Sequence, residues 1–471
     1  MSWKTLSLLF CSYNLAHAGG FQMHEQNASV GDVHAGYAVD TYDASVNFYN
    51  SAALTEILNA KTTTSAVTVA NFVSFKGSTA VEATTLSSPP IYGSGETSTK
   101  GLHVIPSMHY ATPINDKYAF GISLASPFAA ELEWSDKAFT RYNTTLNGIK
   151  AVNLSPSLAY KVSEDLSLGF GPDLQYVSMQ INKKVGTNFD LFNNNLDLSN
   201  YDSIVTNNLT NAKLGWHAGT LWKPTNNLKL GFNYRSEINH HATGESKLKG
   251  KLAGSFGSES NNKVNKSKNL KAIIKIPQNI AFSFELQPMQ DWSFVSTVMY
   301  THWSIVDSFD LKNVPTAFED PYEYVPIYLG LVKNTLRLKD TYTFLNGFHW
   351  QYNDHLKLKT GFGYDQTPTN NHYRDLKMPD GNRYLFGLGA NYKYSHNFNM
   401  EFGWMYVAIN KTKINNISLI PDPGVSVMNP GERNEIHGHT RGHAHVIGMQ
   451  FTMNTEDMYS YTKGRFRKFY S

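Results

Sequence analysis

The sequence predicts an all-β protein, a fourteen-stranded antiparallel transmembrane β-barrel. Three observations support this fold class. Short polar turns divide the chain at nearly even intervals, apolar residues alternate with polar ones between the turns, and the number of strands they imply is even. Strict alternation is what a strand with one apolar face requires, and its repetition with short turns at one end and long polar loops at the other is typical of membrane barrels.

Six turns set the strand pairs. They lie at residues 114–117, 163–165, 224–227, 288–291, 353–355 and 395–397. After the fifth turn, Leu358 and Phe362 fall on one face of the segment, whereas Lys359 and Gly363 fall on the other. Six turns pair twelve strands, one strand precedes them at about residues 61–76, and one follows at about residues 441–453. An even total places both ends of the barrel on the short-turn side.

Composition agrees with a barrel. The chain has 471 residues, of which 41% are hydrophobic and 13% aromatic, and no run approaches the roughly 20 apolar residues of a membrane helix. Abundant Tyr and Trp suit the girdles at membrane interfaces. The soluble alternative is a large β-sandwich or propeller. The net charge is only +3, and the basic residues are dispersed among acidic ones, which argues against a nucleic-acid partner.

Residues 1–18 have the features of a signal peptide, with Lys4, an apolar stretch at residues 6–10 and Ala16-His17-Ala18 before the cut. The single cysteine, Cys11, lies inside this segment. The mature chain is therefore expected to be cysteine-free, which suits an oxidising periplasm. The expected destination is the bacterial outer membrane, crossed many times.

Two segments flank the barrel of residues 60–453. Residues 19–59 do not alternate, are rich in Gly and Ala, and close at Asn50-Ser51-Ala52. Small residues allow tight backbone packing, so this segment is interpreted as a hatch inside the lumen, with a loose periplasmic leader as the alternative. Residues 454–471 mix Lys and Arg with aromatic residues. They are interpreted as a periplasmic tail, with contact to anionic lipid as the alternative.

The chain resembles the FadL family of outer-membrane long-chain fatty acid transporters from residue 19 to residue 453. The most specific block is Gly361-Phe362-Gly363-Tyr364-Asp365-Gln366-Thr367-Pro368. Further similar motifs, in the same order as in the family, are Gly19-Gly20-Phe21-Gln22 and residues 105–110, 113–116, 153–160, 234–237, 276–277, 300–304, 338–342, 379–384 and 444–446.

The resemblance implies a monomeric barrel closed by the N-terminal hatch. Substrate would meet a hydrophobic groove among the outer loops, then an apolar pocket, and would leave sideways at a kinked third strand. No cofactor or metal is implied, because transport is downhill diffusion. The expected partners are a long-chain fatty acid or another hydrophobic small molecule, and the lipid and lipopolysaccharide of the membrane. Some relatives take up aromatic hydrocarbons, which is the alternative substrate class.

The resemblance also suggests hatch and strand positions. Phe21 would reach into the apolar pocket, and Asn50 and Ala52 would hold the hatch, although Ser51 stands where the family commonly has proline. Ser126 and Pro127 fall where the third strand should kink, since proline removes a ladder donor. Ordinary strand termination is the alternative reading of Pro127.

Charged residues complete the candidate site. A buried carboxylate needs a cationic partner. The resemblance places one cation at the end of the fifth strand, on Lys183, and a second at Asn334, where the adjacent Lys333 would substitute. Alternation points Arg383 and Asp365 inward, as a pair that is expected to be structural rather than ligand-binding, although Arg383 remains a ligand candidate.

Three other functions compete with transport. The histidines at 437, 439, 443 and 445 suggest a metal site, but His443 shares its face with Ile447 and Met449, which favours an interfacial cluster. A lipid hydrolase needs Ser, His and an acid together, and the chain has no Gly-x-Ser-x-Gly motif. A general porin is disfavoured because a hatch would block its lumen.

Overall fold

The computed structural model describes residues 22–83, 90–185, 202–253, 263–315, 330–420 and 432–455. The signal peptide predicted at residues 1–18, Phe21, and residues 456–471 of the predicted tail lie outside this part of the chain.

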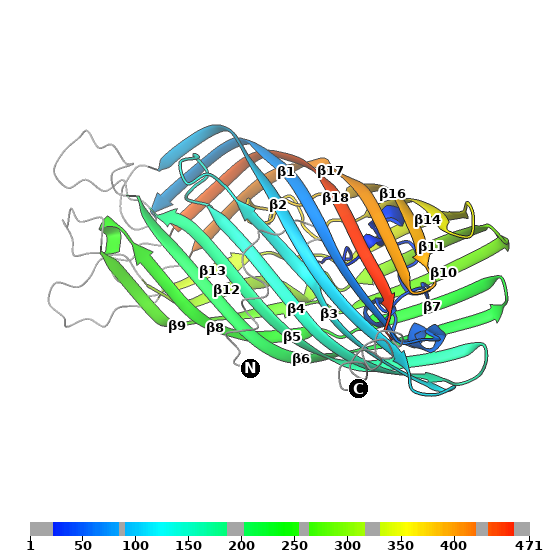
Figure 1. The fold of residues 1–471 in the computed structure, drawn as a ribbon. Helices are drawn as coiled ribbons and strands as arrows, with labels where there is room; N and C mark the ends of the chain where they lie inside the picture. The colour runs from blue at the N-terminus through cyan, green and yellow to red at the C-terminus, as the bar shows by residue number, and fades with distance from the viewer. Residues whose placement is uncertain are drawn as a thin grey trace, which may run out of the picture.

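The described residues form one closed antiparallel sheet (Figure 1), in which β1 pairs with both β2 and β18. The strands are β1 (Lys61–Ala83), β2 (Ile91–Pro113), β3 (Tyr118–Glu133), β4 (Leu146–Lys161), β5 (Leu166–Val185), β6 (Ser203–Thr225), β7 (Leu228–Arg235), β8 (Ile238–Lys249), β9 (Val264–Ile276), β10 (Asn279–Met289), β11 (Trp292–Thr301), β12 (Ser308–Val314), β13 (Gly330–Thr335), β14 (Thr341–Gln351), β15 (Leu356–Asp365), β16 (Arg383–Ser395), β17 (Phe398–Ile420) and β18 (Glu432–Asn454).

Four adjacent strands of the barrel are each interrupted once and so count as two. The eighteen strands of the described residues therefore make up fourteen barrel strands. The interrupted pairs are β7 with β8, β9 with β10, β11 with β12, and β13 with β14. Pro277, which lacks an N–H, accounts for one break, and the short 3₁₀-helix η5 (Trp303–Ile305) occupies another. The predicted closed barrel of fourteen strands is confirmed.

Alternation sorts the side chains of each strand between lipid and lumen. On β16, Tyr384 and Leu388 are exposed on the outer face, while Arg383 is buried. Aromatic side chains stack across neighbouring strands on the outside, as in the Trp292–Trp350 pair with ring centroids 5.3 Å apart. An outer face of this kind is what a hydrocarbon environment selects. Among the residues that the structure describes, no helix has the length and apolar character needed to cross a membrane.

The N-terminal segment, residues 22–60, lies inside the barrel toward its short-turn end (Figure 1, dark blue). It contains the 3₁₀-helices η1 (Ala28–Asp32) and η2 (Ser51–Glu56) and the short α2 (Val46–Tyr49). The helix η1 packs against β15 to β18, and η2 packs against β3 to β6 on the other side. The segment therefore spans the lumen from wall to wall. The 3₁₀-helix η4 (Lys251–Ala253) lies outside this segment, after β8.

Candidate functional site in the barrel lumen

An apolar cluster lines the upper lumen, toward the long-loop end. It consists of Phe128, Ala130, Ile149, Ala151, Val177, Met179, Ile181, Val205, Leu209, Ile238, Ala242, Leu248, Ala253, Leu270, Ala272, Ile274, Ile276, Trp303, Val306, Phe309, Leu311, Val314, Leu338 and Met378. Most members are inward residues of β3 to β6, β8, β9 and β12. Ile238, Ile276, Trp303 and Leu338 lie beside the four strand interruptions, so the breaks turn these side chains into the cluster.

Lys183 lies on the face of β5 that carries the apolar cluster. Ile181, two residues earlier, belongs to the cluster, and Val185, two residues later, packs against it. The residue directly opposite Lys183 on β6 is Val205, another cluster member. Residues two apart on a strand share a face, so the partly buried Lys183 places an ammonium group at the edge of the apolar lining.

Lys333 and Asn334 lie on opposite faces of β13. Asn334 pairs with Phe309 of the cluster and donates a hydrogen bond of 3.0 Å to its carbonyl oxygen. Lys333 is exposed on the other face, across from Asp310. The structure therefore brings Lys183 and Asn334, but not Lys333, to the lining of the upper lumen.

Asn50, Ser51 and Ala52 are buried where the N-terminal segment meets β5 and β6. The Asn50 side-chain amide donates to the carbonyl oxygens of Ala38, at 2.6 Å, and Thr220, at 3.0 Å. Its Oδ1 accepts from the Ala52 N–H and thereby caps η2.

Two glycines of the barrel wall make this approach possible. A Cβ on Gly219 would lie 2.0 Å from Asn50 Oδ1, and one on Gly169 would lie 2.3 Å from the Ala52 nitrogen. Such distances are far inside van der Waals contact. Only glycine therefore fits at these two wall positions while the segment is docked.

Buried charges hold the segment from the β5–β7 side. Arg235 contacts both carboxylate oxygens of Asp173, at 3.0 and 2.9 Å, and also donates to the Phe48 carbonyl oxygen of α2. Asp173 further accepts from Ser155 and lies 3.1 Å from Nδ1 of His217. Because each of these groups is buried and hydrogen-bonded, removing one leaves the others uncompensated.

A second set of buried charges lies on the opposite wall, around η1. Oδ2 of Asp32 is 2.7 Å from Nε2 of His349, and Lys359 Nζ is 2.6 Å from Glu401 Oε1. Burial raises the pKa of the Asp32 carboxyl, but Lys359 and the hydrogen bond with His349 outweigh it and lower the pKa to about 2. Asp32 is therefore ionised, and its charge attracts the N-terminal segment to this wall.

Arg383 forms two buried ion pairs. One guanidinium nitrogen lies 3.0 Å from Asp365 Oδ2, and the other lies 2.5 Å from Asp380 Oδ1. Both terminal nitrogens are therefore occupied by carboxylates of this chain, which favours a structural role over ligand binding.

In the N-terminal segment, burial raises the pKa of Glu25 to about 7, even though Arg383 acts in the opposite direction.

The third strand leaves its neighbour at Ser126 and Pro127. The ladder between β2 and β3 ends at the pair Met108–Leu124, and the ladder between β3 and β4 shifts register between Ala125 and Phe128. Within the described residues, the part of β2 above Met108 pairs only with β1, whereas the upper part of β3 pairs with β4. A gap in main-chain pairing thus opens between two adjacent barrel strands.

The N-terminal segment occupies the lower corner of this gap. The Gln26 side chain donates to the Ser126 carbonyl oxygen and accepts from the Ser126 N–H, both at 2.8 Å. Met23 donates its N–H to the Pro127 carbonyl oxygen at 2.8 Å, and Gln22 bridges to Phe128. Phe128 belongs to the apolar cluster, so the beginning of the described chain lies at the cluster's edge.

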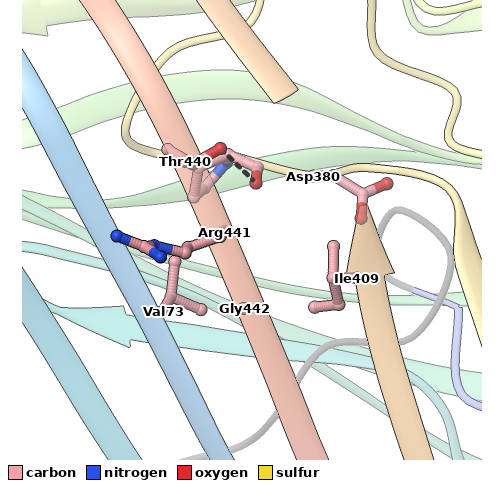
Figure 2. Close-up of a pocket in the computed structure, with 7 residues that line it drawn as sticks. Val73, Asp380, Ile409, Thr440, Arg441 and Gly442 are labelled. Atoms are coloured by element: carbon pink, nitrogen blue, oxygen red, sulfur yellow. Dashed lines mark hydrogen bonds between the residues drawn. The ribbon is translucent and has the colours of Figure 1, made fainter. Parts of the chain in front are cut away.

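A small pocket lies beside Arg383, near the irregular part of β17. It is lined by Val73, Pro379, Asp380, Ile409, Thr440, Arg441 and Gly442 (Figure 2). Asp380 lines this pocket while it holds Arg383, and Thr440 donates to the Pro379 carbonyl oxygen. The pocket is small and separate from the apolar cluster.

In the part of the chain that the structure describes, two further clusters contain the residue types of a catalytic or a metal site. Ser157, His217 and Asp173 make hydrogen bonds in the order of a hydrolytic triad, at 2.8 and 3.1 Å, but they are 3%, 0% and 2% exposed, and Asp173 is committed to Arg235. Such burial beneath the docked segment keeps a substrate away from Ser157. Over the described ranges, no group of three or more metal-ligating side chains is gathered, and His443 stacks on Phe72 at the outer surface.

A closed antiparallel barrel with exposed apolar side chains outside and a packed segment inside defines an integral outer-membrane transport protein. Residues 9–454 match the family described as outer membrane protein transport protein (OMPP1/FadL/TodX), and the chain belongs to this family.

Two curated relatives illustrate the match. Outer membrane protein P1 of Haemophilus influenzae is 25% identical over 441 residues, which cover 88% of this chain and 91% of that protein. The long-chain fatty acid transport protein of Escherichia coli K12 is 22% identical over 342 residues, covering 66% of this chain and 72% of that protein.

Solved structures share the fold. A Pseudomonas aeruginosa FadL homologue superimposes with a TM-score of 0.75 at 21% identity, over 93% of this chain and 100% of that one. The Ralstonia pickettii toluene transporter TbuX gives a TM-score of 0.58 at 14% identity, over 90% and 97%. Membership of the family makes this chain an outer-membrane transport protein.

The sequence did not single out several charged residues of the lumen as functional, although their inward positions could have been recognised. Asp173, Arg235, His349 and Glu401 occupy inward positions of predicted strands, so alternation alone marks them as buried charges. Their partners lie across the lumen or on the N-terminal segment, and no local pattern predicts such pairings. Gln26 gave no signal at all, because its contacts depend on how the segment folds against β3.

Proposed function

We propose that the protein carries long-chain fatty acids, or amphiphiles like them, by passive diffusion from the outer face to the membrane interior. The observation that supports this most is the position of Lys183 at the edge of the apolar cluster. An apolar lining bordered by an ammonium group complements a molecule with a long alkyl chain and one anionic head. An aromatic hydrocarbon carries no anionic group that could pair with this ammonium.

The proposed exit is the gap between β2 and β3. Each CH₂ group moved into water costs about 0.8 kcal/mol, so release of an acyl chain into the periplasm would be opposed. A route that opens toward lipid at Ser126 and Pro127 avoids this cost. We also propose that Phe21 reaches into the apolar pocket. This is supported by Gln22, the next residue, which pairs with Phe128 of the cluster. Deleting residues 19–22 is expected to alter ligand binding while the barrel still assembles.

Substitution of Lys183 tests the head-group site. A charge-assisted contact contributes about 1.5–3 kcal/mol, so Lys183→Ala should weaken oleate binding by roughly tenfold or more. Binding of oleyl alcohol should hardly change, and Lys183→Arg should retain much of the affinity for oleate. Titration of the purified barrel in detergent with each ligand measures both.

Lys184 offers the matched control. It is the adjacent residue, and its ammonium lies 3.5 Å from Asp136 and 3.9 Å from Asp202 instead of lining the cluster. Lys184→Ala should therefore leave oleate affinity unchanged. Equal oleate affinity in wild type and Lys183→Ala would remove Lys183 from the site.

Growth of a host that lacks its own transporter separates the substrate classes. The gene should restore growth on oleate. Rescue on toluene but not on oleate would instead favour the aromatic alternative, which the family's toluene transporters suggest.

A further inference from the structure

The outer surface of β17, β18, β1 and β2 carries a group of exposed cations above its apolar part. We define this basic patch as Lys76, Lys100, Lys411, Lys413 and Arg441. On β18 the outward residues run from Phe451, Met449 and Ile447 through two histidines to Arg441. On β2 they run from Met108, Val104 and Leu102 to Lys100. The first cation on these strands therefore follows directly on lipid-facing or aromatic side chains.

Strand pairing places four members of the patch beside one another, and Lys411 lies two residues before Lys413 at the register shift of β17. Lys413, His439 and Lys76 are successive cross-strand partners on one face. Arg441 pairs with Ser74, two residues from Lys76, and Lys100 pairs with Phe72. In Figure 2 the Arg441 side chain extends to the opposite side of its strand from Asp380, and Arg441 is exposed. Side chains two residues apart on paired strands are close enough to share one ligand.

Few acidic side chains face the patch within the described part of the chain. None of its five cations takes part in an ion pair there. The nearest acid by pairing is the exposed Glu96, opposite Lys76. Glu435, farther out on β18, is already paired with Arg433 at 2.6 Å. Five cations and one facing acid, Glu96, leave a net charge of about four positive units at this membrane boundary, which attracts external anions.

The strands beside the patch, β16 and β15, and β11 beyond them, show a different boundary. There the outward residues at the upper end of the apolar surface are tyrosines, among them Tyr300, Tyr364 and Tyr384, and Tyr300 donates to Asp340 at 2.7 Å. Cross-strand pairing leads from Tyr384 through Ala408, His443 and Phe72 to Lys100. One continuous row therefore changes from neutral tyrosines to cations around the circumference.

We infer that the basic patch binds the phosphate groups of lipopolysaccharide in the outer leaflet. Clustered Lys and Arg beside a membrane attract anionic head groups, and phosphate oxygens accept charge-assisted hydrogen bonds from both residue types. The patch lies directly above the apolar surface, where the phosphates of an outer-leaflet glycolipid are found. This inference does not depend on which compound is transported.

Charge-matched variants test the patch. The double variant Lys76→Gln with Arg441→Gln removes two cations from the patch. Its control, Lys117→Gln with Lys393→Gln, removes two exposed cations from the short-turn end. Both variants must first show heat-modifiable migration on a gel, which verifies barrel folding. Binding of purified lipopolysaccharide to the full-length barrel in detergent is then measured by native mass spectrometry at increasing salt.

The patch variant should bind lipopolysaccharide about tenfold more weakly than wild type, while the control should match wild type. Wild type should also bind chemically dephosphorylated lipopolysaccharide more weakly than the intact form, and added salt should reduce only the phosphate-dependent part. Equal affinities of wild type and the patch variant would overturn the inference, as would equal binding of intact and dephosphorylated lipopolysaccharide.

Discussion

The two halves of the barrel lumen are lined by opposite kinds of side chain. The lower lumen is crowded with paired charges such as Asp173 with Arg235 and Lys359 with Glu401, which face the N-terminal segment. The upper lumen is lined by the apolar cluster, with Lys183 at its edge. Directional polar contacts fix one backbone in one position, whereas apolar contacts tolerate many poses of a flexible chain. The difference indicates a segment held in one position below, and above it an apolar lining of the kind that the proposed binding of a flexible acyl chain requires.

Breaking the Asp173–Arg235 pair should disturb the lower lumen most. Removing one partner of a buried pair typically costs about 3–5 kcal/mol, so Arg235→Ala should release α2 from the wall through loss of the bond to Phe48. Hydrogen exchange of residues 22–60 should accelerate strongly. The double variant Asp173→Asn with Arg235→Gln should be milder, because no isolated charge remains. If both variants exchange at the wild-type rate, these charges do not hold the segment.

Overpacking at the wall should have the next largest effect. Gly219→Val would drive a side chain into Asn50, at a cost of about 1–3 kcal/mol or more. The segment should become sensitive to protease added to the purified barrel. Gly36→Ala is the matched control, because a Cβ there would meet its nearest atoms at 4.0 Å. Similar cleavage in the two variants would contradict the proposed tight fit at Gly219.

The pH dependence of docking gives a further comparison. Burial raises the pKa of Glu25 from 4.5 to about 7, so the docked carboxyl keeps its proton over a range where the undocked one has lost it. Because the docked segment binds this proton more tightly, docking weakens as pH rises from about 4.5 to about 7 and stays weaker above that. The full change is on the order of 3 kcal/mol.

Glu25→Gln should abolish most of this dependence, as seen in hydrogen exchange of residues 22–60 between pH 5 and pH 8 (about pH 4.5 to 7 being the sensitive range). Glu56→Gln, at the other end of the segment, serves as control. A wild-type pH profile that survives in Glu25→Gln would show that another group causes it.

Local patterns predicted the strands well, because alternation and turn chemistry act over a few residues. The first strand begins at Lys61, as predicted, and the turn before Tyr118 coincides with residues 114–117. The outermost parts were missed. Strand β1 continues to Ala83 and β18 begins at Glu432, because their outward residues there are polar and the apolar alternation fades.

The candidate site was only partly predictable. The family resemblance indicated Lys183 and alternation placed Arg383 inward, but neither could reveal that Arg383 is held by Asp380 as well as Asp365. The face of Lys333 depends on the strand break after Thr335, which periodicity did not reveal. The contact of Gln26 with Ser126 joins residues 100 positions apart, and such pairings arise only from the closed three-dimensional fold.

The seam between β1 and β18 has a consequence for folding. These two strands are each 23 residues long, and their ladder joins Lys61 to Asn454. Pairing between the first and last strands cannot form until almost the whole chain has been made, and contacts of such sequence separation slow folding. Before the seam forms, both strands present open edges that invite pairing with other chains. The N-terminal segment precedes β1 and must be enclosed as the two edges meet. Closure of the barrel and enclosure of this segment therefore occur in the same step.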